Sequence, residues 1–517
     1  MSVCFTSIFV FTAFAAFAQD SLFSFNEIAY TSDFEKSTFR KHFKEKREES
    51  LGLLLAPTTS MNDQKAASIE QEINSIVAAL RAEGLDKKKA DKKVKIVYDK
   101  VHNQILKKYE LENRFSEVFE SGNYNCVTAS ALYALVFEQL GIPYQVKEEP
   151  THVYLISYPE KENILVETTS PMFGYVAFTD DFKTRFVTNL KNQKIVGADE
   201  GSSSSTDQLF NKYYFKKEKI SLTELIGLHY MNDALFLRDH GQWKNGYHQL
   251  EKAYLLYPSS RCKYLLMVFG VQLVANEKLS PKEKARYVAK ISKFGEEGIS
   301  ADMIKGEFVN LTQQLLFRDN DKSLYRECYD IYRKGITDKE LLSEIDYIYF
   351  YENGRAYYNT GNLLKAKSFF ANALGLQPNN LDLGGVFVST IAQSLRTVDN
   401  DDALLDTLNL YKLKYPSLSQ FANFNAMLAN ANLVRYGSAY EKGKPETAKK
   451  YKEAFDAIFK EYPTINVSDI VVGKAYSFVS TYYFRLGQKA KAREVIQEGL
   501  KISPNNYQLR TRLQMIH

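Results

Sequence analysis

Three residues that together can perform nucleophilic chemistry lie close in the sequence, within positions 122–171. Cys126 follows a short loop, His152 comes 26 positions later, and Glu167 comes 15 positions after that. A thiol can act as a nucleophile, an imidazole can take its proton, and a carboxylate can orient the imidazole. This order predicts a catalytic triad of Cys126, His152 and Glu167.

The segment after the loop has the features of a helix that would activate a thiol. Residues 126–140 have a wide apolar face and end at Gly141 and Pro143, a typical helix terminus. Asn125 suits the N-cap, which places Cys126 in the first turn. Unpaired N–H groups and the helix dipole favour an anion there. We therefore expect the thiol pKa to lie below its usual value of about 8.5.

The loop before this helix supplies candidate donors for an oxyanion. The N–H group of Cys126, with a group from Asn123, Tyr124 or Asn125, would point to where negative charge develops during acyl transfer. We predict that these three loop residues support the site.

His152 and Glu167 occur in segments with strand character. Residues 152–158 and 164–168 flank a turn-rich stretch at 159–163, a pattern typical of a hairpin. A symmetric five-residue turn would place the two side chains on opposite faces, because side-chain direction alternates along a strand. The triad therefore requires a four- or six-residue turn, or a bulge.

The triad order, the helix end Leu-Gly-Ile-Pro at 140–143 and the apolar helix at 94–106 resemble the transglutaminase-like superfamily. The resemblance covers about residues 90–180. It implies a papain-like α+β fold and acyl transfer through Cys126 to water or to an amine. The family usually has Asp where Glu167 stands, and a Trp before the cysteine that this chain lacks. The alternative is therefore an inactive domain in a binding protein.

From residue 221 onward, a helical repeat of about 34 residues replaces the strand pattern. Segments 227–258, 347–378 and 473–504 carry small residues, aromatic residues and a closing proline at corresponding positions. The spacing resembles tetratricopeptide repeats, in which small residues let paired helices approach each other. We expect a continuous solenoid with degenerate copies that end at Pro416 and Pro463.

These patterns predict two folded parts, an α+β papain/transglutaminase-like domain and an all-α tetratricopeptide-type solenoid. A serine run at 202–205 indicates a flexible linker between them. The predicted bounds are a signal peptide at 1–18, a helical segment at 19–88, the transglutaminase-like domain at 89–195, the linker at 196–217 and the repeat domain at 218–517.

Composition limits the partners. The net charge of +5 over 517 residues is small, so nucleic acid is not an expected partner. The sequence has no metal-ligand spacing, phosphate loop or dinucleotide fingerprint, and we expect no cofactor. Beyond the signal peptide, no stretch is long and apolar enough for a stable membrane span. The expected partner is a protein or peptide, bound as substrate or in the groove of the repeats.

The N-terminus resembles a secretory signal peptide. Residues 1–18 carry no charge and end in Ala16-Phe17-Ala18, a small-x-small cleavage site before Gln19. We expect the exported protein, periplasmic or secreted, to begin at Gln19. N-terminal sequencing of exported material checks this prediction, and a mature chain that still begins at Met1 would contradict it.

Overall fold

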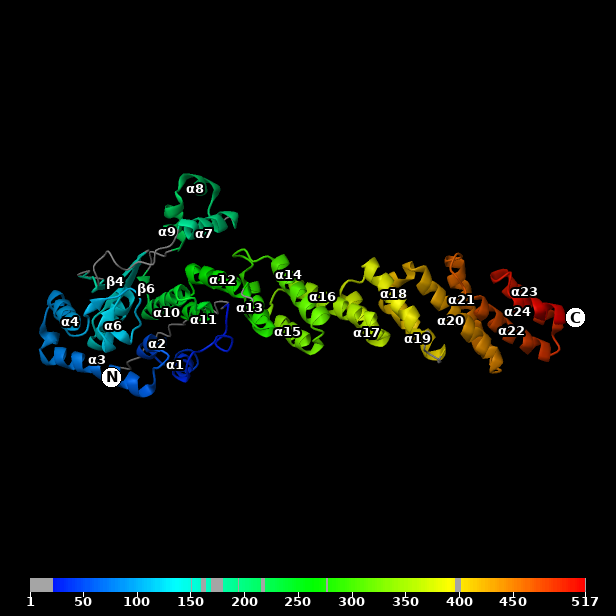
Figure 1. Ribbon diagram of the computed structural model, residues 1–517, viewed down its shortest axis with the longest axis horizontal. Helices are drawn as coiled ribbons and strands as arrows, with labels where there is room; N and C mark the ends of the chain where they lie inside the picture. The colour runs from blue at the N-terminus through cyan, green and yellow to red at the C-terminus, as the bar shows by residue number, and fades with distance from the viewer. Residues whose placement is uncertain are drawn as a thin grey trace, which may run out of the picture. The chain divides into compact units, whose positions relative to one another are not determined.

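The computed structural model describes residues 22–149, 151–159, 164–168, 180–193, 195–214, 219–275, 278–395 and 401–516. The predicted signal peptide and its cleavage site lie outside these residues. The protein is mostly helical, with small sheets in its N-terminal part (Figure 1). The chain forms two compact units, Met1–Ile304 and Lys305–His517.

The first unit begins with helices that precede and surround the candidate site. They are α1 (Asp33–Phe43), α2 (Ser50–Leu55), α3 (Asp63–Ala82), α4 (Ala90–Gln104), α5 (Glu117–Glu120) and α6 (Cys126–Leu140). A two-stranded parallel sheet joins the end of α4 to the loop before α6, because β1 (Lys108–Tyr109) pairs with β2 (Asn123–Tyr124).

α6 forms as the sequence predicts. Asn125 is its N-cap and Gly141 its C-cap, with the glycine at a φ of 66° that suits a residue without a side chain. Every residue from Cys126 to Phe137 is buried. α6 lies against strand β4, where Ser130 Oγ donates to the carbonyl of Val153 at 3.3 Å.

The main sheet is antiparallel and has the strand order β5-β4-β3-β6. Its strands are β3 (Tyr144–Glu149), β4 (His152–Ser157), β5 (Ile164–Val166) and β6 (Lys219–Ile220). The predicted hairpin is β4–β5, in which Ser157 pairs with Ile164. The connection is therefore the six residues 158–163, one of the lengths that the triad requires. Continuing this register by one pair places Glu167 on the same face as His152.

The predicted flexible linker contains helices. α8 (Ala198–Ser203) and α9 (Thr206–Tyr214) lie within it, and α7 (Asp180–Asn192) precedes it. Phe186 of α7 packs edge-on against Phe210 of α9 at 5.5 Å and against Tyr264 at 5.0 Å. These aromatic contacts hold the helices on either side of the serine run at 202–205. The small polar residues of that run gave no sign of them.

The boundary between the compact units also differs in place from the predicted linker, since it falls after Ile304. The first repeat helices, α10 (Leu222–Asp239), α11 (Trp243–Leu256), α12 (Ser260–Val274) and α13 (Pro281–Ile291), belong to the first unit. α10 packs against both α2 and α6. The predicted domain bounds therefore stay predictions.

The second unit consists of helix pairs, and α14 (Ala301–Thr312) contains its boundary. The further helices are α15 (Lys322–Gly335), α16 (Lys339–Asn359), α17 (Leu363–Leu376), α18 (Leu381–Leu395), α19 (Asp401–Lys414), α20 (Ala422–Glu441), α21 (Pro445–Glu461), α22 (Asp469–Arg485), α23 (Lys489–Ile502) and α24 (Tyr507–Met515). The predicted repeats at 347–378 and 473–504 correspond to the packed pairs α16–α17 and α22–α23. The degenerate copies correspond to α18–α19 and α20–α21.

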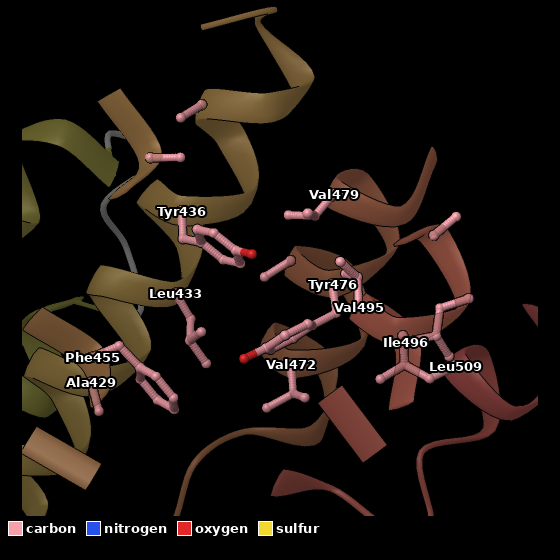
Figure 2. Close-up of a cluster of buried hydrophobic side chains, with 14 of the residues drawn as sticks. Ala429, Leu433, Tyr436, Phe455, Val472, Tyr476, Val479, Val495, Ile496 and Leu509 are labelled. Atoms are coloured by element: carbon pink, nitrogen blue, oxygen red, sulfur yellow. The ribbon is translucent and has the colours of Figure 1, made fainter. Parts of the chain in front are cut away.

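Neighbouring pairs share one apolar core, as Figure 2 shows for the C-terminal helices. Tyr436 of α20 and Tyr476 of α22 meet edge to face, with ring centroids 5.8 Å apart. Val495 and Ile496 of α23 and Leu509 of α24 complete the cluster. Each pair therefore covers the apolar face of the next, the packing expected of a solenoid.

Close packing between paired helices predicts opposite effects of two alanine substitutions. A Cβ atom at Gly354 would lie 2.5 Å from the Phe370 ring, whereas one at Gly375 would have nothing within 4 Å. We expect Gly354→Ala to destabilise the protein by about 1–3 kcal/mol through overpacking. Gly375→Ala should stabilise it by up to about 1 kcal/mol, because alanine favours a helix. Urea unfolding measures both, and equal effects would contradict the packing.

Candidate active site

His152 and Glu167 form a hydrogen-bonded pair. Nε2 of His152 lies 2.7 Å from Oε1 of Glu167, and the imidazole side chain is only 11% exposed. A carboxylate only accepts hydrogen bonds, so Nε2 carries the proton and Nδ1 keeps the lone pair of the neutral ring. Glu167 therefore orients the imidazole, the arrangement that a triad requires.

The other ring nitrogen of His152 is available. Nδ1 is buried and has no hydrogen-bond partner within the part of the chain that the structure describes. A buried polar atom without a partner raises the free energy of the folded state, and such atoms often mark functional sites. Nδ1 is thus the atom that can take a proton from a nucleophile.

Cys126 begins α6 and is 6% exposed. Burial raises the pKa of its thiol to about 11, while the N–H groups of Val153, Val127 and Cys126 itself lower it. The negative charge of Glu167 raises the pKa of this thiol further. The helix start does favour the thiolate, but desolvation outweighs it. The prediction of a thiol pKa below about 8.5 is therefore wrong.

The thiol and the dyad meet at the start of β4. The N–H group of Val153 interacts with the Cys126 thiol, and Val153 follows His152 directly in the chain. Over the ranges that the structure describes, no hydrogen bond joins the thiol to His152. Such bonds are often long before substrate binds. The structure thus pairs His152 with Glu167 and brings Cys126 beside them.

Asn125 holds the start of α6. Its Oδ1 accepts from the N–H groups of Val127 at 3.0 Å and Thr128 at 2.9 Å. Its own N–H donates to Thr128 Oγ1 at 2.9 Å, and its Nδ2 donates to Leu111 O at 3.1 Å. The N–H and Nδ2 groups of Asn125 are therefore already bonded and do not point to an oxyanion. Asn125 supports the site by positioning the start of α6.

Asn123 and Tyr124 form β2, beside this cap. The carbonyl of Asn123 accepts from Asn113 Nδ2 at 2.9 Å, and Tyr124 is buried edge-on to Tyr109. Asn113 also accepts from Thr128 Oγ1 at 2.7 Å. Sequence analysis missed Asn113 and Thr128. The Asn-x-x-Thr spacing of a capping box is a signal for Thr128, whereas the role of Asn113 depends on contacts that no local pattern encodes.

Comparison with protein families identifies the repeats. The family described as tetratricopeptide repeat matches residues 349–380 and 473–506. These stretches coincide with α16–α17 and α22–α23. The C-terminal part of the chain therefore contains tetratricopeptide repeats, which imply a protein-binding role.

No curated protein matches the chain. Among solved structures, the chain is similar to one titled "Structure of Naa15/Naa10 bound to HypK-THB", with 10% identity and a TM-score of 0.16. The alignment covers 64% of this chain and 60% of that chain. Where the structure describes the chain, its helices lack the length and apolar character needed to cross a bilayer.

The raised thiol pKa predicts the reactivity of Cys126. Because only the thiolate reacts, alkylation by iodoacetamide should keep accelerating from about pH 8.5 to about pH 11. Cys262 should react more slowly at each pH, since burial raises the pKa of its thiol even further. Mass spectrometry of alkylated peptides from the native protein gives both rates. A Cys126 profile that levels off below about pH 8.5 would contradict this assignment.

Proposed function

We propose that this protein is a cysteine enzyme that transfers acyl groups, with Cys126 as nucleophile, and that its repeats bind a protein partner. The observation that carries the proposal is the 2.7 Å bond between His152 Nε2 and Glu167 Oε1, which leaves the buried Nδ1 atom as a base.

The chemistry begins from a neutral thiol. Since burial raises the pKa of Cys126 to about 11, the thiol is protonated near neutral pH. His152 Nδ1 takes its proton as the sulfur attacks a carbonyl carbon, and Glu167 stabilises the resulting imidazolium. The imidazolium then protonates the departing amine, which leaves a thioester on Cys126.

The thioester is then cleaved by water or by a second amine. His152 again takes a proton from the attacking group and returns it to the sulfur, so that the free thiol is restored. Water completes the hydrolysis of an amide, and an amine completes a cross-link. The protein therefore belongs, in this proposal, to the hydrolase or acyltransferase class.

The transglutaminase-like resemblance of residues 90–180 supports the same chemistry. Glu167 stands where that family usually has Asp, and its longer side chain reaches the imidazole from just beyond the end of β5. The register of β4 and β5, in which Ser157 pairs with Ile164, puts both side chains on one face of the hairpin. These two features support the proposal of a triad.

A groove in the second unit suits a peptide of the partner protein. Its cavity, of about 560 Å³, lies between α22 and α24 and includes Phe484, Tyr507, Arg512 and Met515. Tyr507 is 82% exposed and Met515 is 71% exposed. Exposed apolar side chains around a groove are typical of a protein-binding surface. We also propose that the protein acts outside the cytoplasm, after removal of residues 1–18.

The second candidate is a binding protein whose enzyme-like domain is inactive. The observation that favours it is the thiol, which is 6% exposed and has its pKa raised by burial. In this alternative, the repeats and the domain both serve as docking surfaces, and Cys126 is a small core residue.

Substitutions in the triad test the proposal with two probes, dansylcadaverine incorporation into casein and ammonia release from casein. We expect Cys126→Ala to abolish activity and His152→Ala to reduce it by about 10²–10⁴-fold, the usual contribution of a general base. Glu167→Gln should cost less, because Glu167 only orients the ring, and Glu167→Asp should retain activity. Cys262→Ala is the matched control and should be active.

A measurement without substrate separates the two candidates. At pH 7.5, His152→Ala should slow the alkylation of Cys126 by about tenfold or more, since the base then no longer assists. Alkylation of Cys262 in the same sample should not change. If Cys126 is alkylated at the same rate in the wild type and in His152→Ala, the catalytic proposal is wrong and the second candidate, a binding protein, is favoured.

A further inference from the structure

We infer that the first repeat helices, α10 to α12, position both halves of the candidate active site, with Asp233 and Glu148 as positioning residues. All residues of this inference lie in the first unit. The inference rests on the proposed function, because that proposal identifies Cys126, His152 and Glu167 as the site. Two separate chains of polar contacts carry it, one to the cysteine and one to the histidine.

The first chain of contacts runs from α10 to the start of α6. Asp233, 4% exposed, accepts from Arg114 Nε at 2.8 Å and from Gln249 Nε2 at 2.6 Å. Arg114 follows Asn113, whose Oδ1 accepts from Thr128 Oγ1 at 2.7 Å. A buried carboxylate on a repeat helix therefore holds the loop that is bonded to the first turn of α6.

That first turn carries the nucleophile. Thr128 and Asn125 form the capping box of α6, and Cys126 lies between them in the sequence. Two of the N–H groups that favour the thiolate, those of Val127 and Cys126, belong to the same turn. Movement of the loop would thus displace the groups that surround the sulfur.

The second chain of contacts runs from the C-cap of α11 and from α12 to β3, the strand that pairs with β4. Glu148 on β3, 4% exposed, accepts from Tyr257 Oη at 2.8 Å and from Arg261 Nη2 at 2.5 Å. Across the sheet, Glu148 pairs with Val153, and the adjacent pair includes His152. The repeat helices therefore hold the strand next to the one that presents the histidine.

Polar contacts join the loop to α10. A cavity of about 250 Å³ lies at this joint, lined by Glu112, Arg114, Asp233 and His240 among others. Glu112 and His240 bridge the same joint, with 2.9 Å between Oε1 and Nε2. Hydrogen bonds of this kind fix direction as well as distance, because each needs a defined angle.

Three variants of the full chain test the inference. Arg114→Met breaks the contact to the cysteine half, and Glu148→Gln weakens the contact to the histidine half. Glu35→Gln is the matched control, because Glu35 makes a buried ion pair with Lys252 that joins α1 to α11 and includes no residue of the two chains of contacts. Arg114 is 34% exposed, so its replacement leaves a foldable chain, which thermal unfolding verifies.

The first measurement is hydrogen exchange of the amides at the start of α6. In Arg114→Met, the amides of Val127 and Thr128 should exchange about tenfold faster, the change expected from loss of one supporting hydrogen bond. The Glu35→Gln control should leave their exchange unchanged. This measurement requires no catalytic activity.

The second measurement is the fold-change in Cys126 alkylation that His152→Ala causes at pH 7.5. This fold-change should be smaller in the Arg114→Met and Glu148→Gln backgrounds than in the wild type, and unchanged in Glu35→Gln. A residue that only stabilises the fold would not change how strongly Cys126 alkylation depends on His152.

The outcomes are distinguishable. If both measurements in the two variants equal those of the Glu35→Gln control, the inference is overturned. If His152→Ala has no effect in the wild-type background, the proposed function fails. In that case the exchange rates of Val127 and Thr128 alone decide whether the repeat helices position this turn.

Discussion

The first unit depends on the rule that a charge taken out of water needs a partner. Glu35 and Lys252 are both 0% exposed and pair at 2.7 Å between α1 and α11. Glu148 with Arg261 follows the same rule between β3 and α12. Because each partner comes from a different part of the chain, neither part can bury its charge alone. The N-terminal helices, the sheet and the first repeat helices therefore form one unit.

Desolvation also acts on the thiol, with the opposite consequence. In the part of the chain that the structure describes, no cation offsets the burial of Cys126, and the amide groups of Val153 and of the helix start offset it only in part, so the pKa of the thiol is raised. A resting thiolate is therefore not the species present near neutral pH. In the proposed function, acyl transfer through this cysteine depends on the imidazole as a base. Nδ1 of His152, which has no hydrogen-bond partner among the described residues, is the atom that can take this role.

Features with local causes could be predicted from the sequence. The caps of α6 follow from Asn125 and Gly141, and the helix pairs follow from glycines such as Gly354, whose absent side chain leaves room for Phe370. The hairpin also has a local pattern. The length of its connection decides whether His152 and Glu167 share a face. From the sequence, a triad was compatible with four or six residues, or with a bulge, and the sequence did not decide among them.

Features with distant causes could not be predicted. β3 has the sequence Tyr-Gln-Val-Lys-Glu-Glu, which does not resemble a buried strand. Glu148 is buried there because Arg261, 113 positions later, neutralises it. The predicted linker contains helices for a similar reason, since Phe210 within it packs against Phe186 of α7. The thiol pKa likewise depends on burial by groups that the motif around Cys126 does not contain.

The same contrast explains why the repeats differ along the chain. In α16–α17 the helices meet through small and aromatic residues, and this pair lies in a stretch that the tetratricopeptide family matches. In α10–α11 the buried side chains include Asp233, Gln249, Glu251 and Lys252. These residues pair with groups on α1, on α13 and in the loop before α6, or with one another. The α10–α11 pair thus uses its buried surface for polar contacts with the N-terminal part of the first unit, and its sequence lies outside the stretches that the tetratricopeptide family matches.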